Sequence, residues 1–169
     1  MTRKRAMVFI DAQNLSFGSK NYKDGIDNDP TKLVAELTEG YDLIRPYWFD
    51  AYPPGDRDSK EGFFHFLGTN GFRVVDMPLR ENDDGYEQKG LDITLATELI
   101  ARGFDDAYDV AVVVTGDDDF DRAIRYVQDR GKVVEVAAFE STMSDGLKRR
   151  ADTYIKLDDI AERIRRNPA

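Results

Sequence analysis

A chain of 169 residues with 41% hydrophobic residues is long enough for one domain with a substantial core, and it contains no apolar run long enough to cross a membrane. The absence of cysteine excludes disulfides and thiolate metal sites, and it favours a cytoplasmic location. The formal net charge of −9 disfavours general nucleic-acid binding, so such a function would need a local basic patch or bridging metal ions.

Apolar runs rich in β-branched residues predict the strands of a mostly parallel sheet. Residues 7–11 and 109–116 are almost continuously apolar, which is typical of central strands that are buried on both faces. The remaining strands are expected at 42–52, 72–79, 132–139 and 153–157. Helical spacing of apolar residues predicts helices at 31–40, 60–70, from 89–90 onward, and at 121–130, 144–151 and 158–166. The polar segments 16–30 and 80–88 are expected to be surface loops.

The alternation of strands and helices predicts an α/β fold in which helices cover both faces of the sheet. A strand order of 3-2-1-4-5 would place the first strand beside the strand that ends at Gly116. Ligands bind at such a switch point, outside the carboxyl ends of the strands. We expect residues 1–169 to form a single domain, with a core at 7–140 and a C-terminal strand and helix at 141–166.

Three consecutive carboxylates, Asp117, Asp118 and Asp119, follow the second of these central runs and precede a helix. Asp is a favoured N-cap and suits the positive end of a helix. Capping explains one of the three, or two. Because packed carboxylates repel one another unless a cation lies between them, the third favours a divalent metal.

Two further carboxylates are expected near this turn. Asp11 ends the first strand, and Asp92 lies in the first turn of the helix that begins after Gly90. With Asp117 and Asp119 they form an oxygen-only set without His or Cys, which suits Mg²⁺ or Mn²⁺. Hydrolysis by metal-activated water is the chemistry that this set favours.

Three segments resemble the motifs of NYN domains, the LabA-like branch of the PIN-like nucleases: 9–15 (FIDAQNL), 89–92 (KGLD) and 114–120 (VTGDDDF). The resemblance implies a three-layer α/β/α PIN-like fold with the 3-2-1-4-5 sheet. It also implies a metal-dependent ribonuclease, expected to be an endoribonuclease acting on single-stranded RNA with Mg²⁺ or Mn²⁺. The catalytic and metal-binding residues would then be Asp11, Asp92, Asp117 and Asp119.

On the same resemblance, Asn14 and Thr115 would support the site by hydrogen bonds and Lys89 could contact a phosphate. Asp118 is left out of the metal set, because adjacent residues entering a helix point in different directions. RNA binding would depend on local cations, which a homodimer could supplement. The candidates are Lys20, Lys23, Arg57, Lys60, Arg80, Lys89 and Arg149.

Other interpretations of the acidic residues stay open. A haloacid-dehalogenase-type phosphatase also places an Asp at the end of its first strand, but it needs a second Asp where this chain has Gln13. A non-catalytic module could bind RNA or a protein partner on the same fold, although mutually repelling carboxylates favour catalysis. A dinucleotide-binding domain is disfavoured, because no glycine-rich turn follows the first strand.

Overall fold

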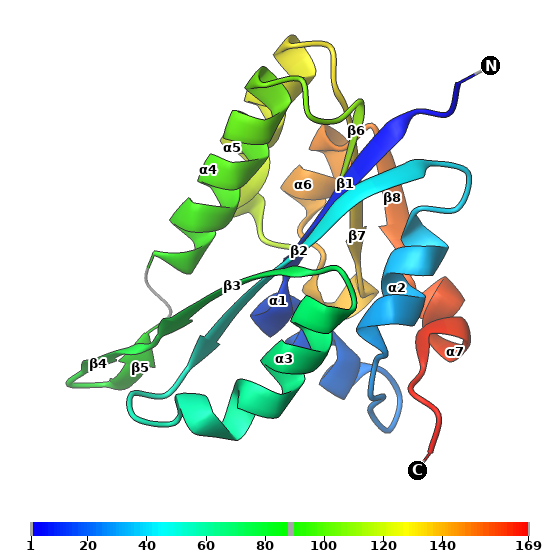
Figure 1. Cartoon of the computed structure of the whole chain (residues 1–169). Helices are drawn as coiled ribbons and strands as arrows, with labels where there is room; N and C mark the ends of the chain where they lie inside the picture. Colours follow the sequence, from blue (N-terminus) through cyan, green and yellow to red (C-terminus); the bar gives the residue numbers. More distant parts are fainter. Residues whose placement is uncertain (1, 88–89, 169) are drawn as a thin grey trace.

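The computed structural model describes residues 2–87 and 90–168, and a six-stranded parallel sheet forms its centre (Figure 1). The strands are β1 (Arg5–Asp11), β2 (Asp42–Tyr52), β3 (Arg73–Pro78), β6 (Val110–Val114), β7 (Val133–Ala138) and β8 (Thr153–Lys156). Their order is β3-β2-β1-β6-β7-β8, and each neighbouring pair is parallel. The expected 3-2-1-4-5 arrangement is confirmed for five strands, and β8 extends the sheet beyond β7.

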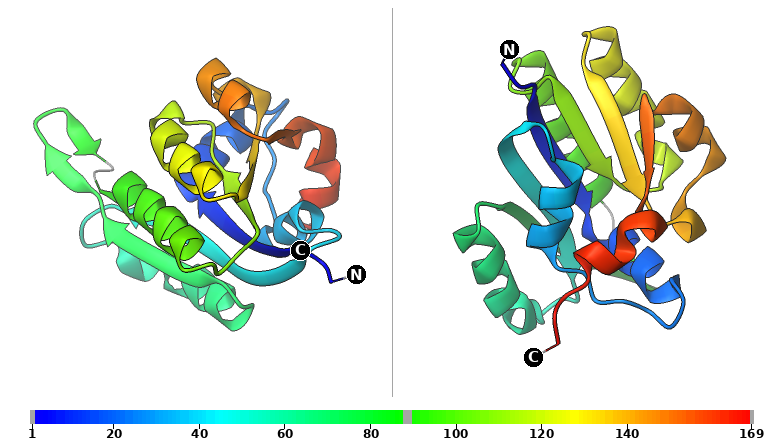
Figure 2. Two further views of the ribbon diagram at one scale, coloured as in Figure 1. Left: turned by 90° about the horizontal axis from the view of Figure 1, so that it is seen from above. Right: turned by 90° about the vertical axis from the view of Figure 1, so that its right-hand side faces the viewer.

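Helices cover both faces of the sheet, so the molecule has the expected three layers (Figures 1 and 2). One face packs against α1 (Ala12–Asn21), α2 (Pro30–Leu37), α3 (Glu61–Thr69) and α7 (Ala161–Ile164). The other face packs against α4 (Leu91–Phe104), α5 (Asp121–Asp129) and α6 (Asp145–Arg150). Short 3-10 turns complete the chain at η1 (Arg57–Lys60), η2 (Asp118–Phe120), η3 (Glu140–Thr142) and η4 (Leu157–Ile160).

The central strands β1 and β6 are buried because helices pack on both sides of them. Along β1, Val8 and Ile10 join the core beneath α1 and α2, whereas Met7 and Phe9 join the core beneath α4 and α5. The parallel register pairs Ile10 with Val114. The chain therefore leaves both strands side by side, at the same edge of the sheet. Among the described helices, none has the length and apolar character needed to cross a bilayer.

The expected loop at 16–30 is wrong over its first part, because α1 continues to Asn21. The buried face of this helix carries small or polar residues, including Gly18 and Ser19, so its sequence lacks a strong apolar stripe. Gly18 allows close packing: a Cβ atom there would lie 2.9 Å from the Phe139 side chain. Close packing requires small residues on this face, and their presence removes the apolar periodicity that would predict the helix.

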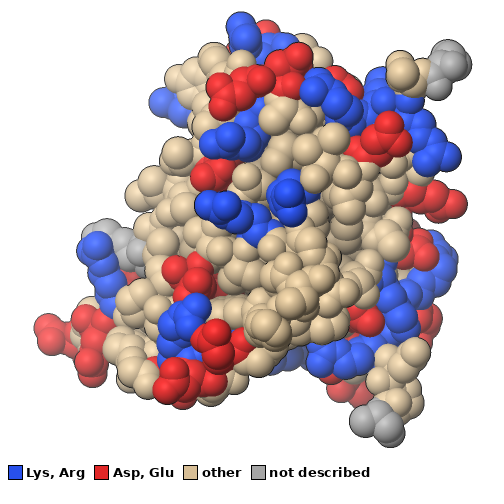
Figure 3. Space-filling model, in the orientation of Figure 1, with Lys and Arg blue, Asp and Glu red and all other residues tan. Residues whose placement is uncertain are grey.

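The expected loop at 80–88 is also wrong, because β4 (Arg80–Asn82) and β5 (Gly85–Glu87) form an antiparallel hairpin. The hairpin projects from the body of the molecule (Figures 1 and 2), and its side chains are exposed. With no buried face, its strands lack the apolar alternation that predicts a strand. Figure 3 shows acidic side chains at this projecting end.

Candidate metal centre

The exits of β1 and β6 and the start of α4 surround one open cavity of about 390 Å³. Its walls include all four acidic residues that the sequence singles out: Asp11, Asp92, Asp117 and Asp119. Neighbouring side chains from α1 complete the lining. The fold thus brings together carboxylates from three separate segments of the chain.

Asp11 lies deepest, as the last residue of β1 and the N-cap of α1. Its side chain is almost fully buried, with the residue 9% exposed. Oδ1 accepts a hydrogen bond from the Asn14 backbone N–H at 3.2 Å, and Oδ2 accepts one from the Thr115 hydroxyl at 3.1 Å. Burial raises the pKa of the Asp11 carboxyl, and the nearby Asp117 carboxylate adds to that rise, although these hydrogen bonds oppose it.

Hydrogen bonds tie the exit of β1 to the exit of β6. The fully buried Thr115 hydroxyl donates to Asp11 and accepts from the Asp117 N–H at 3.2 Å. The Asn14 side-chain Oδ1 accepts from the Gly116 N–H at 3.0 Å. Two polar side chains therefore fix the positions of both acidic strand exits.

Gly116 allows the following segment to close over this turn. A Cβ atom at this position would lie 1.9 Å from the Thr142 carbonyl oxygen, a distance that no side chain tolerates. The Gly116 carbonyl in turn accepts a hydrogen bond from the Ser144 N–H at 3.0 Å. The glycine between strand and carboxylates is therefore required by close backbone packing against the η3 segment.

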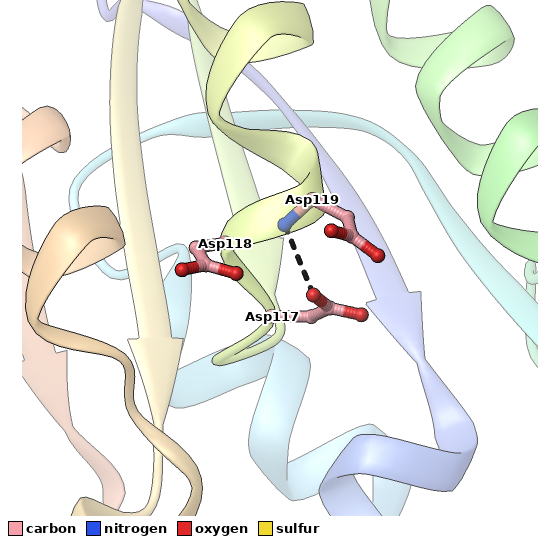
Figure 4. A group of neighbouring side chains, drawn as sticks. All are labelled: Asp117, Asp118 and Asp119. Atoms are coloured by element: carbon pink, nitrogen blue, oxygen red, sulfur yellow. Dashed lines mark hydrogen bonds between the residues drawn. The ribbon is translucent and has the colours of Figure 1, made fainter.

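The turn after Gly116 spreads its three carboxylates to two sides. Each of Asp117, Asp118 and Asp119 offers an oxygen within 4.8 Å of the others. The Asp117 and Asp119 side chains lie on one side of the turn and Asp118 on the other (Figure 4). Asp118 lines a different cavity, together with Arg149 and Arg150. It is nevertheless close enough to be a further candidate ligand, which the sequence reasoning left out.

Asp92 reaches the cavity from the first turn of α4. The Asp117 carboxylate is the largest cause that raises the pKa of Asp119; slight burial, Asp118 and Asp92 raise it further. Asp92 therefore lies within electrostatic reach of Asp119, just as Asp117 acts on Asp11. Within residues 2–87 and 90–168, none of these four carboxylates forms an ion pair.

Helix capping explains two of the four carboxylates. Asp11 caps α1, and Asp117 caps η2 by accepting the Asp119 N–H at 3.0 Å, the bond drawn in Figure 4. Within the described residues, Asp92 and Asp119 cap no helix: the N-cap of α4 is Gly90, with a φ of +98°, and the N-cap of α5 is Phe120. Their proximity to two other carboxylates has no local structural explanation.

The sequence matches the model of the NYN domain family over residues 5–158. The chain belongs to the NYN domain family. It is 26% identical over 164 residues to the Low amplitude and bright protein LabA of Synechococcus elongatus, covering 92% of this chain and 85% of that protein. A crystal structure of a protein of unknown function from Vibrio parahaemolyticus shares the fold, with a TM-score of 0.74 and 23% identity over 93% of this chain and 94% of that one.

The expectation of a LabA-like NYN protein is thereby confirmed, and all four carboxylates fall within the segment that matches the NYN model. Lys89, expected to contact a phosphate, lies outside the described residues. Two residues of this cavity were not predicted from the sequence to belong to the site: Gln13 and Phe17. Their spacing of four places them on one face of α1, a signal that becomes readable only once 16–21 is known to be helical.

Proposed function

We propose that this NYN protein is a ribonuclease that hydrolyses RNA phosphodiester bonds with a divalent metal at Asp11, Asp92, Asp117 and Asp119. The observation that carries the proposal is the convergence of these four carboxylates on one cavity, although they come from three segments. Membership of the NYN family, in which metal-dependent ribonucleases are expected, supports the same chemistry.

The donor atoms of the cavity fit a hard divalent cation. The set consists of carboxylate oxygens, with the Asn14 and Gln13 side chains beside them and no His or Cys. Mg²⁺ and Mn²⁺ prefer oxygen ligands, and Mg²⁺ keeps several waters while it binds one or two carboxylates. The mutual repulsion that raises the pKa of Asp119 is the cost that such a cation would remove.

The carboxylates and Thr115 would have different roles in the site. Asp11, Asp92, Asp117 and Asp119 would hold the cation, and Thr115 would keep Asp11 and the Asp117 backbone in position through the two bonds of its hydroxyl. When bound, Mg²⁺ or Mn²⁺ supplies positive charge that offsets the phosphate and lowers the pKa of water at the site. Because the cavity is open to solvent, a flexible strand has access to it.

The deciding experiment is cleavage of a labelled, mixed-sequence single-stranded RNA with Mn²⁺, with Mg²⁺ and with EDTA, at low and at high salt. We expect cleavage that requires the metal and that Asp117→Asn abolishes. Asp117→Asn keeps an oxygen that can accept the Asp119 N–H, so its turn should remain folded. Binding of RNA without cleavage under any metal would favour the non-catalytic module instead.

A further inference from the structure

A groove leads away from the carboxylates along the exposed side of α1. Three neighbouring cavities form it, with volumes of about 390, 420 and 370 Å³. Gln13 and Phe17 line both the carboxylate cavity and the middle cavity, and Ser16 and Lys20 line both the middle and the far cavity. This spacing lies on one face of a helix, so α1 forms a continuous wall of what we call the α1 groove.

Aromatic rings face this wall. Trp48 and Phe63 line both the middle and the far cavity, and their rings pack edge to face with centroids 5.5 Å apart. Phe17 stands where the groove meets the carboxylate cavity, and it is 63% exposed. A phenylalanine this exposed contributes little to the core. An exposed aromatic face beside a phosphodiester site is suited to stacking an unpaired base.

Lys20, Lys60 and Arg166 line the groove together with Asp50 and Asp27, whereas the titratable side chains that line the adjacent carboxylate cavity are all acidic among the described residues. Lys20 belongs to both the middle and the far cavity, and Arg166 lies at the far end, where it pairs with Asp27 at 3.5 Å. The Lys60 ammonium also lines the middle cavity, where it donates to Asp50 Oδ1 and to the Ala51 carbonyl, both at 3.0 Å. Within the described residues, Lys20 is the one of these three cations that forms no ion pair, so it is the side chain of the groove that suits a phosphate.

One residue that lines the far cavity also carries a hydrogen-bond acceptor without a partner among the described residues. The side-chain Oδ1 of Asn28 is buried and accepts no hydrogen bond within the described part of the chain. A buried acceptor without a donor is costly.

We propose that the α1 groove binds single-stranded RNA next to the phosphodiester held at the carboxylates, with an unpaired base stacked on Phe17 and an adjoining phosphate at Lys20. This assignment rests on the proposed ribonuclease function, because the carboxylate cavity marks the reacting phosphodiester. Stacking on Phe17 requires a base that is free of its own neighbours. The groove therefore selects a single strand over a duplex.

The test is binding of a short labelled single-stranded RNA of mixed sequence, followed by fluorescence anisotropy in EDTA and in Ca²⁺, so that binding is measured separately from cleavage. We expect Phe17→Ala to weaken binding about ten-fold and Phe17→Trp to restore it, because any aromatic face can stack a base. Lys20→Glu should weaken binding by a similar factor and reduce its dependence on salt.

Matched controls make the same changes away from the groove. Phe104→Ala removes an exposed phenylalanine at the end of α4 opposite Asp92, and Lys4→Glu reverses an exposed lysine near the N-terminus. Both should bind RNA as the wild type does. An RNA with an abasic nucleotide in place of the stacked base should bind wild type and Phe17→Ala alike, which identifies stacking as the lost interaction.

The outcomes separate this inference from the proposed function. If Phe17→Ala and Lys20→Glu bind RNA as tightly as a wild type that cleaves it, the groove assignment is overturned and the nuclease stands. If both variants lose binding but the wild type binds RNA and does not cleave it with Mn²⁺ or with Mg²⁺, the groove stands and the nuclease falls. A wild type that binds neither single-stranded nor duplex RNA overturns both.

Discussion

The two ends of the central strands β1 and β6 carry the same acidic residue type in opposite electrostatic settings. At the amino end, Arg5 lies 3.0 Å from Asp109 and 3.2 Å from Asp106, and Lys132 also pairs with Asp106. A hydrogen bond from Arg5 lowers the pKa of Asp109, and one from Lys132 lowers that of Asp106. At the carboxyl end the pKa shifts of Asp11 and Asp119 run the other way.

This difference separates carboxylates that stabilise the fold from carboxylates that the fold holds at a cost. Each acid at the amino end has a cation as its partner, and its charge favours the folded state. At the carboxyl end, the Asp117 carboxylate raises the pKa of Asp119, and the hydroxyl of buried Thr115 joins Asp11 to the Asp117 backbone. An arrangement that persists against its own repulsion is expected where a ligand compensates it.

The largest expected effect contrasts one neutralised acid at each end. Asp119→Asn should reduce metal-dependent RNA cleavage by more than about 100-fold, because even partners outside the ligand shell contribute about 10- to 100-fold. Asp109→Asn, the matched change at the amino end, should leave cleavage within about two-fold of wild type. Initial rates with Mn²⁺ measure both. Equal activity of Asp119→Asn and wild type would refute the site assignment.

Metal binding should raise the melting temperature, and the increase should depend on the carboxylates at the carboxyl ends of β1 and β6 and not on those at the amino ends. At about 100 times Kd, a ligand that binds only the folded state adds about 2.7 kcal/mol, which corresponds to a Tm increase of about 5–10 °C in a chain of this size. We expect this increase with Mn²⁺ for wild type and for Asp109→Asn, but not for Asp117→Asn. Thermal scans with Mn²⁺ and with EDTA give the comparison, and an increase that Asp117→Asn retains would place the metal elsewhere.

Most of the fold could be predicted from the sequence, because both central strands are unbroken apolar runs. The strand expected at 42–52 coincides with β2, Asp42–Tyr52. The predictions were wrong for two segments that do not bury a large apolar face. These are α1, whose buried side includes Gly18 and Ser19, and the exposed β4–β5 hairpin. Both segments owe their structure to close packing or turn geometry, which periodicity does not report.

The convergence of the carboxylates was predictable for a related reason. Parallel neighbours bring their carboxyl ends to one edge, so the order of β1 and β6 places Asp11 beside Asp117. The position of Phe17 next to the carboxylates could not be predicted, because it depends on α1, and residues 16–30 were expected to form a loop. The ion pairs of Arg5 with Asp106 and Asp109 join residues more than 100 positions apart, and no local pattern predicts such pairs.

Removing the hydroxyl that holds the carboxyl end together should cost stability. Thr115→Val keeps the shape of the fully buried side chain but removes the donor to Asp11 and the acceptor for the Asp117 N–H. We expect a loss of about 1–3 kcal/mol in the free energy of unfolding, the cost of leaving buried polar groups unpaired. Thr115→Ser retains the hydroxyl and should lose less. Urea denaturation distinguishes them; a larger loss for Thr115→Ser than for Thr115→Val would mean that the methyl group matters more than the hydrogen bonds.

The two ends should also respond with opposite sign when one charge is removed in the absence of metal. Asp119→Asn relieves repulsion from Asp117, so its Tm in EDTA should rise slightly. Asp109→Asn weakens the pairing with Arg5, so its Tm should fall by about 2 °C, the scale of a partly exposed ion pair. Differential scanning calorimetry of the three proteins measures both shifts. A fall in Tm for Asp119→Asn would show that its charge stabilises the free protein.

The smallest expected effect is the pH dependence of these two stability differences. Each difference between variant and wild type should disappear over its own pH range. The folded-state pKa of Asp119 lies above its usual 3.8, so as the pH falls the folded protein takes up this proton before the unfolded chain does, and the wild type gains stability. The stability advantage of Asp119→Asn over wild type should therefore shrink between neutral pH and about pH 4.

Asp109 has a lowered pKa in the folded state. Its contribution to stability is therefore complete above its usual pKa and is lost only as the pH falls through the lower, folded-state pKa. The deficit of Asp109→Asn should accordingly persist to about pH 4 and close below it. Denaturation in EDTA from about pH 7 to about pH 3 measures both stability differences. If both disappear over the same pH range, the two ends of the strands do not differ electrostatically in the way that their contacts indicate.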